Sequence, residues 1–265
     1  MIEVSDHWAP KPLDSEVFAG ARRAIVESWL AAIPRCRLQL VKRPQAAVGG
    51  FSLFLGSSVP ANEWLARVDF ADLDSLFEAD VPGLFRERGG SSADVVDSMV
   101  LVCTHGKRDR CCAKFGMALF NAAAKVSDAV WQTTHLGGHR FAATALVLPV
   151  GMSYGRLQPE DARTWLDAEA QGEIFDLAKT RGRNAYSKHV QAAELLVLEQ
   201  LGRREHGALR FVAEEAIADG RWRVTFQEGS REISVEVGRD ETGDECLGSC
   251  GDESPRAVVN LVRAR

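Results

Sequence analysis

The chain is expected to adopt a mixed α/β fold with a compact α/β unit in its middle third. Apolar stretches that suit buried strands alternate there with helical periodicity, in the order strand, helix, strand, strand, strand, helix. Cysteine and histidine residues follow directly on two of these strands. Because the loops after strands usually hold the chemistry of α/β folds, we expect the functional site in this region.

The composition restricts the class of protein. The 265 residues are 46% hydrophobic and 26% charged, with a formal net charge of −5, as in soluble globular domains. A protein that binds nucleic acid would usually be basic, and no apolar run approaches the ~20 residues of a membrane span. The first residues lack the layout of a signal peptide. We therefore expect a cytoplasmic protein without nucleic-acid or membrane partners, in which clustered cysteines bind metal or act in redox chemistry.

Residues 1–94 are expected to form an N-terminal region of mixed helix and strand. Apolar residues recur at helical spacing over 15–32, with Ser15 as a candidate N-cap. Strands are expected over 37–42 and 51–55. A Gly-Gly-Ser-Ser stretch at 89–92 indicates the boundary.

Residues 95–172 form the expected core. The pattern predicts, in order, a buried strand over 95–102, a helix over 112–125, strands over 129–134 and 142–150, a hairpin partner at 154–157 and a helix over 161–170.

Residues 173–265 are expected to pack on that core as a helix and antiparallel strands. The helix covers 186–201 and ends at Gly202. The stretches 221–226 and 232–237 alternate with period two around a Gly229-Ser230 turn, which predicts a hairpin. An acidic loop over 240–253 and a closing strand over 257–262 complete the chain.

Two compact blocks contain the candidate metal ligands. They are Cys103-Thr-His-Gly-Lys-Arg-Asp-Arg-Cys-Cys112 and His135-Leu-Gly-Gly-His139. Two thiolates and two imidazoles suit zinc, but the eight residues between Cys103 and Cys112 do not match a zinc finger. Two ligand pairs on separate loops also suit an iron–sulfur cluster of Rieske type. The spacing alone leaves both alternatives open.

The same blocks carry a family resemblance. Together with the stretches Thr134–Ala142, Leu148–Leu157, Arg181–Tyr186 and Gln191–Glu194, they resemble the sucrase/ferredoxin-like family of thioredoxin-like ferredoxins. This resemblance implies a thioredoxin-like fold that carries a [2Fe–2S] cluster, with Cys103, Cys112, His135 and His139 as ligands. Residues 1–94 are then interpreted as a degenerate thioredoxin-like unit. We find no carboxylate pair that would indicate a glycosidase, whatever the family's name.

The adjacent residues Cys111 and Cys112 leave one ambiguity. The family's pattern has its cysteine three residues after the aspartate, here Asp109, which favours Cys112. Cys111 is then interpreted as a small buried hydrophobic residue, with ligation by Cys111 as the alternative.

Other residues are assigned supporting roles. Those expected to surround the ligands are His105, Gly106, Arg108, Asp109, Cys111, Gly137 and Gly138. Cys36 is expected to be a buried core thiol. Cys246 and Cys250 could hold a second metal, form a disulfide or be free thiols. Too few spare ligands remain in the chain to favour a second cluster. Five basic residues would surround the site, either as a solvated surface or as a docking patch for an acidic redox partner: Lys107, Arg108, Arg110, Lys114 and Arg140.

These features favour an electron-transfer protein over a stand-alone enzyme. The hypothesis is one-electron exchange with a reductase or an oxygenase-type partner, coupled to proton uptake at an imidazole. A second hypothesis is a redox sensor or redox-enzyme component that uses the cluster or Cys111. A third is a structural zinc protein that binds a partner.

Overall fold

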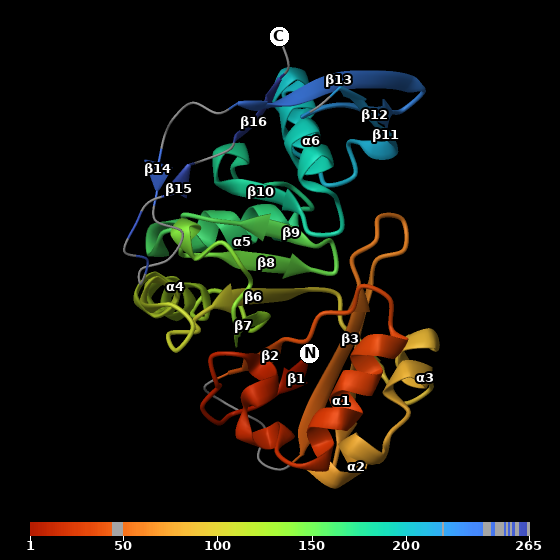
Figure 1. Ribbon diagram of the computed structural model, residues 1–265, viewed down its shortest axis with the longest axis vertical. Coiled ribbons are helices and arrows are strands. Elements are labelled where there is room, and N and C mark those ends of the chain that lie inside the picture. The colour runs from red at the N-terminus through yellow and green to blue at the C-terminus, as the bar shows by residue number, and fades with distance from the viewer. Residues whose placement is uncertain are drawn as a thin grey trace.

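A ten-stranded sheet joins the N-terminal and middle parts of the chain in the computed structural model (Figure 1). The structure describes residues 1–43, 50–218, 220–240, 245–246, 252, 254, 256–257 and 260–263. In spatial order the strands are β10 (Thr180–Arg183), β9 (Met152–Tyr154), β8 (Ala145–Leu148), β6 (Met99–Cys103), β7 (Val130–Thr133), β2 (Leu40–Lys42), β1 (Ile2–Glu3), β3 (Phe51–Ser57), β4 (Trp64–Phe70) and β5 (Asp94–Val95). Because β3 runs steeply in Figure 1 while β6, β8 and β9 lie nearly flat, the sheet is strongly twisted.

Helices cover this sheet. The α-helices of the described residues are α1 (Ala21–Ala32), α2 (Leu73–Glu78), α3 (Val81–Arg86), α4 (Arg110–Ala123), α5 (Ala162–Ala170) and α6 (Lys188–Leu201). The 3-10 helices are η1 (Pro12–Asp14), η2 (Glu16–Phe18), η3 (His139–Phe141), η4 (Pro159–Asp161) and η5 (Leu177–Lys179). The helices α1, α2 and α3 lie on the N-terminal strands, and α4 and α5 lie on the middle strands (Figure 1).

The middle of the sheet is a β6–α4–β7 crossover unit with parallel strands. All five residues of β6 are buried, as expected for a strand that is covered on both faces. β8 pairs antiparallel on the other side of β6, and β9 continues from it. This topology confirms the expected mixed α/β fold.

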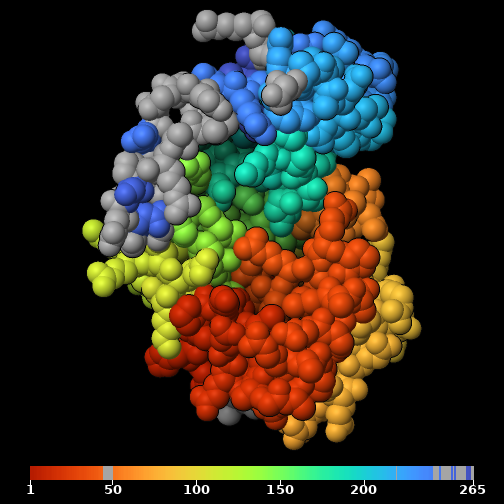
Figure 2. Space-filling model, in the orientation of Figure 1, coloured from red at the N-terminus to blue at the C-terminus, as the bar shows by residue number. Residues whose placement is uncertain are grey.

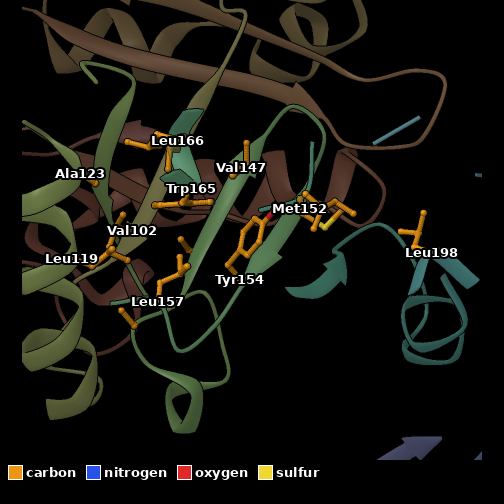
Figure 3. Packing of buried hydrophobic residues seen from close by; sticks show 14 of the residues in the cluster. Val102, Leu119, Ala123, Val147, Met152, Tyr154, Leu157, Trp165, Leu166 and Leu198 are labelled. Carbon is orange, nitrogen blue, oxygen red and sulfur yellow. The ribbon is translucent and has the colours of Figure 1, made fainter. Parts of the chain in front are cut away.

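One face of this unit carries the largest hydrophobic cluster. Leu119 and Ala123 of α4 pack toward Val102 of β6, and Tyr154 of β9 contacts Trp165 of α5 (Figure 3). Leu119, Ala123 and Trp165 have 0% of their surface exposed. Burying one large apolar side chain stabilises the folded protein by about 1.5–3 kcal/mol. The cluster therefore holds α4 against β6.

The predicted N-terminal helix begins later than its apolar pattern indicates. Residues 16–18 form the short η2, and α1 starts only at Ala21. Gly20 has a φ of 65°, and Ala19 is extended. A left-handed residue interrupts helical hydrogen bonding, so Ser15 does not cap α1.

A second sheet closes the chain. Its order is β11 (Arg210–Ala218), β12 (Arg221–Glu228), β13 (Arg231–Asp240) and β16 (Asn260–Arg263), and β14 (Glu245–Cys246) pairs with β15 (Arg256–Ala257). Glu228 pairs with Arg231 across Gly229 and Ser230, which confirms the predicted hairpin. This sheet lies at the end of the molecule opposite the red N-terminal segment (Figure 2).

The strands β1 to β5 and β6 to β10 belong to one sheet. The two sets are joined by hydrogen bonds between β2 and β7. The proposed division at residues 94 and 172 stays a prediction. Most of the expected loop at 240–253 lies outside the described residues. Within the described part of the chain, no helix is both long and apolar enough to cross a membrane.

Candidate metal centre

Two neighbouring parallel strands bring Cys103 close to the histidine loop. Cys103, the last residue of β6, lies opposite Thr133, the last residue of β7. The chain then passes through Thr134, whose backbone N–H donates to the Leu40 carbonyl over 3.0 Å. His135 follows directly. Parallel strands that end together therefore place the Cys103 thiol beside the His135 ring.

The first turn of α4 supplies the second thiol. The Asp109 side chain caps this helix by accepting from the Cys111 backbone N–H at 2.8 Å. The Cys112 N–H donates to the Asp109 carbonyl at 3.1 Å, so Cys112 lies within the first helical turn. A cap of this kind fixes where the helix begins. It thereby fixes which cysteine faces β6.

The two thiols and one ring nitrogen form a compact group. Nδ1 of His135 lies 3.7 Å from Sγ of Cys112 and 4.0 Å from Sγ of Cys103. All three atoms lie within 4.8 Å of one another, and both cysteines are buried. Thiolates and imidazoles are the ligands that zinc and iron–sulfur sites prefer. The group has the composition and the spacing to hold a metal.

His139 lies beside this group but outside it. Its ring stacks on that of His135 with centroids 5.0 Å apart, and its Nδ1 lies 3.8 Å from Oδ2 of Asp109. That Nδ1 is buried and has no hydrogen-bond partner in the described structure. Buried polar atoms are rarely left without a partner. An unpaired ring nitrogen beside two thiols and a second imidazole fits the donor set of a [2Fe–2S] cluster with two Cys and two His ligands.

The two thiols shift each other's pKa in opposite directions. A hydrogen bond from the Cys112 thiol, then one from His135 and the backbone N–H groups of His105 and Leu136, lower the pKa of Cys103 well below its ordinary value. The same thiol–thiol bond and burial raise the pKa of Cys112. One thiolate is therefore already stabilised at neutral pH. Metal binding must then release a proton from Cys112.

His105 supports the histidine loop from behind. It is 2% exposed, and its Nδ1 accepts from the His135 backbone N–H at 3.3 Å. Its ring meets Trp8 edge-on at 5.8 Å, and burial lowers its pKa. His105 thus contacts the backbone of His135, in keeping with a supporting role.

Glycines allow close packing around the site. A Cβ at Gly106 would lie 2.8 Å from Cβ of Ala113, and one at Gly138 would lie 2.6 Å from the Arg181 guanidinium. Gly137 and Gly138 also have positive φ angles of 93° and 69°. The backbone donors to Cys103 are His105 and Leu136. Gly106 leaves too little room beside Ala113 for a side chain, and the left-handed backbone at Gly138 favours glycine there.

Two arginines that were not among the predicted site residues hold the histidine loop. Nη2 of Arg37 donates to the His135 carbonyl at 3.0 Å, and Nη1 of Arg181 donates to the Gly137 carbonyl at 3.3 Å. Arg181 belongs to one of the stretches that resemble the family. That stretch could have indicated a role for Arg181 in the site. Nothing in the sequence around Arg37 indicates such a role.

Two cysteine predictions were wrong. Cys111 is disulfide-bonded and half-buried, not a buried hydrophobic residue or an open ligand, because adjacent helical residues point in different directions. Cys36 is exposed, because it follows the end of α1 in a turn. Cys250 and the side chain of Cys246 lie outside the described residues.

The predicted basic residues surround the site on the surface. All five are exposed: Lys107, Arg108, Arg110, Lys114 and Arg140. Arg108 therefore points to solvent rather than into the site, whereas Asp109 is buried. These exposed cations lie on a chain whose formal net charge is −5.

Comparison with known proteins identifies relatives. A family model described as sucrase/ferredoxin-like matches residues 33–182. Altered inheritance of mitochondria protein 32 of Meyerozyma guilliermondii is 31% identical over 102 residues, which are 34% of this chain and 36% of that protein. The matched part thus spans about a third of that relative.

Solved structures with local similarity include the thioredoxin-like [2Fe-2S] ferredoxin of Aquifex aeolicus. It is 18% identical, with a TM-score of 0.29, and covers 33% of this chain and 92% of its own. A variant of the same ferredoxin is 19% identical, with a TM-score of 0.28, and covers 32% and 99%.

Proposed function

Since this chain belongs to the sucrase/ferredoxin-like family, we propose that it is a one-electron carrier with a single [2Fe–2S] cluster. Cys103 and Cys112 would hold one iron, and His135 and His139 the other. The observation that supports this most is the buried group of two thiols and the His135 Nδ1 within 4.8 Å, with the unpaired His139 Nδ1 beside it.

The ligand charges indicate the potential range. When bound, such a cluster takes up and releases one electron. Two thiolates and two neutral imidazoles bring less negative charge than four thiolates. The same difference separates Rieske centres from plant-type ferredoxins. We therefore expect a higher potential here than in an all-cysteine site.

The imidazoles offer a route to proton coupling. Nδ1 of His135 faces the two thiols, which leaves Nε2 on the far side of the half-buried ring. A ring nitrogen that is not a ligand can gain or lose a proton when the charge at the other nitrogen changes. We expect a midpoint potential that falls as the pH rises above neutrality. A potential that is constant from about pH 6 to 10 would contradict this coupling.

The redox partner is proposed to be a reductase or an oxygenase-type protein with an acidic face. Charge complementarity would speed the encounter at low salt. Replacing Lys107 and Arg110 by glutamate should slow electron exchange with such a partner. Lys188→Glu, at an exposed position on α6, is the matched control. An equal effect of both changes would contradict docking at the basic surface.

Metal analysis tests the cluster directly. Protein purified in air should be red-brown and contain iron and acid-labile sulfide in equal amounts. Reduction with dithionite should give a paramagnetic signal of low average g value. His135→Cys or His139→Cys should keep the cluster and lower its potential, because a thiolate replaces a neutral imidazole. His7→Cys, at an exposed position, should change neither the cluster content nor the potential.

A structural zinc site is the second candidate. The close group contains Cys103, Cys112 and His135, which also suits zinc. Colourless protein with stoichiometric zinc would support this function and exclude the cluster. The hypothesis that Cys111 is a sensing thiol is weakened, because Cys111 is disulfide-bonded.

A further inference from the structure

A cavity of about 370 Å³ lies on the face of the main sheet opposite α4. Its apolar lining includes Phe54 of β3, Leu65 of β4, Leu101 of β6, and Leu146 and Leu148 of β8. Leu101 and Leu146 are direct cross-strand partners. The volume lies within the range of about 300–1,000 Å³ that small-molecule sites occupy. The cavity is thus large enough for a small ligand with an apolar body.

The charged groups along this cavity are all of one sign. Arg35, Arg37 and Arg181 line it, and no aspartate or glutamate of the described residues does so. The chain as a whole has more acidic than basic residues, with a net charge of −5. The lining of this cavity is therefore positively charged, although the chain as a whole is negatively charged.

Arg181 has no carboxylate partner in the described structure. Its Nη1 donates to the Gly137 carbonyl over 3.3 Å, and its guanidinium lies 5.1 Å from the centre of the Phe141 ring. Burial, and then the nearby Arg140, lower its pKa. Arg183, two residues along the same strand, is paired with Glu194 at 2.9 Å. A half-buried cation without a counter-ion is costly, and an anion in the cavity would reduce that cost.

We propose that this cavity binds a small organic anion: a carboxylate on an apolar, aromatic-sized body. The guanidinium of Arg181, assisted by that of Arg37, would receive the carboxylate, because the arginine fork matches its two oxygens. The leucines and Phe54 would enclose the body. The cavity lining thus defines both halves of the ligand.

The site is connected to the histidine loop. Leu136 lines the cavity, and Arg37 and Arg181 hold the carbonyls on either side of it, those of His135 and Gly137. A bound carboxylate competes for these same guanidinium groups. Occupancy should therefore alter the loop that carries His135. This consequence for the potential rests on the proposed cluster, whereas the binding itself does not.

Two matched probes test the binding. We expect 2-naphthoate to bind to the purified protein in calorimetry, and its neutral amide to bind at least tenfold more weakly. Arg181→Gln should weaken naphthoate binding at least tenfold and leave the amide unchanged. Arg37→Gln, at an exposed position, should act in the same direction if Arg181→Gln does not fold. Arg163→Gln, exposed on α5, is the control.

The outcomes separate the site from the cluster. Absence of binding by both probes, or equal binding of both that Arg181→Gln does not change, overturns the proposal. In protein that contains the cluster, saturating naphthoate should shift the midpoint potential, and Arg181→Gln should abolish the shift. A potential that bound naphthoate leaves unchanged overturns the link to the histidine loop. Calorimetry decides the binding even where metal analysis finds no cluster.

Discussion

Gly116 of α4 lies directly against the carbonyl group of Cys103. A Cβ atom at Gly116 would be 1.9 Å from the Cys103 oxygen and 3.0 Å from its carbonyl carbon. Gly116 is one helical turn after Cys112, so both lie on the same face of α4. The absence of a side chain at residue 116 therefore allows the Cys112 thiol to approach the end of β6.

Gly116→Ala should disrupt the metal centre. The added methyl group cannot be accommodated beside backbone atoms, so α4 must move away from β6. We expect a loss of about 1–3 kcal/mol in the free energy of unfolding and a marked fall in bound metal. Urea unfolding and metal analysis measure the two effects.

Gly207→Ala is the matched control for this prediction. A Cβ at Gly207 would meet no atom within 4 Å, so stability and metal content should remain near those of the unmodified protein. A Gly116→Ala protein with full metal content would show that the approach of α4 to β6 is not required.

The adjacent cysteines should respond in opposite ways to replacement. Cys112→Ser removes a thiol that lies 3.7 Å from Nδ1 of His135 and should abolish metal binding. Cys111→Ser removes a disulfide-bonded residue and should retain the metal, with a loss in stability of about 2–4 kcal/mol. Metal content decides between the two positions. Loss of metal in the Cys111→Ser protein alone would reverse the assignment.

The sequence was most informative where local rules act. Period-two alternation around Gly229 predicted the β12–β13 hairpin, and Gly202, with a φ of 65°, ends α6 as expected. The apolar run before Cys103 identified a buried strand. These features depend on residues close together in the chain, and their physical causes can be read directly from it.

Contacts between distant residues were not predictable in the same way. The donation from Arg37 to the His135 carbonyl joins segments that only the tertiary fold brings together. Gly116 is a partial exception. A glycine four residues after a candidate ligand, within a helical pattern, costs about 1 kcal/mol relative to alanine. Its position in the sequence therefore indicates a close approach to a neighbouring segment.

His105 should make stability depend on pH on the acidic side. Burial lowers its pKa in the folded protein below 6.5, so below pH 6.5 the unfolded chain binds the proton first. As the pH decreases below 6.5, the free energy of unfolding therefore decreases by up to about 1.4 kcal/mol per pH unit. The fall ends once the pH passes the lowered pKa. Above pH 6.5 His105 is neutral in both the folded and the unfolded protein, so it causes no loss of stability there.

His105→Asn removes this titration and keeps an oxygen that can accept from the His135 N–H. The variant should therefore lose less stability than the unmodified protein between pH 6.5 and the acidic limit of folding. Urea unfolding at several pH values measures the difference. His7→Asn, at an exposed position, should leave the pH dependence unchanged. An unaltered slope in the His105→Asn protein would mean that another group titrates.

Glu194 should be far more costly to remove than a carboxylate in an exposed ion pair. Its Oε1 accepts from Nε of Arg183 at 2.9 Å, and the two residues are 1% and 4% exposed. Burial outweighs the effect of Arg183 and raises the pKa of Glu194, so the pair itself gives little net stability. Glu194→Ala nevertheless leaves the buried Arg183 guanidinium without a counter-charge, with the neutral His206 carbonyl still accepting from it, which should cost about 3–5 kcal/mol.

Glu27→Ala provides the contrast, because Glu27 and Arg23 form an exposed pair one helical turn apart, at 3.0 Å. It should cost only about 0.3–0.5 kcal/mol. Glu194→Gln should fall between the two, since its amide oxygen still accepts from Arg183. Urea unfolding of the three variants gives the order. Equal losses for Glu194→Ala and Glu27→Ala would show that solvent reaches Arg183 once the carboxylate is gone.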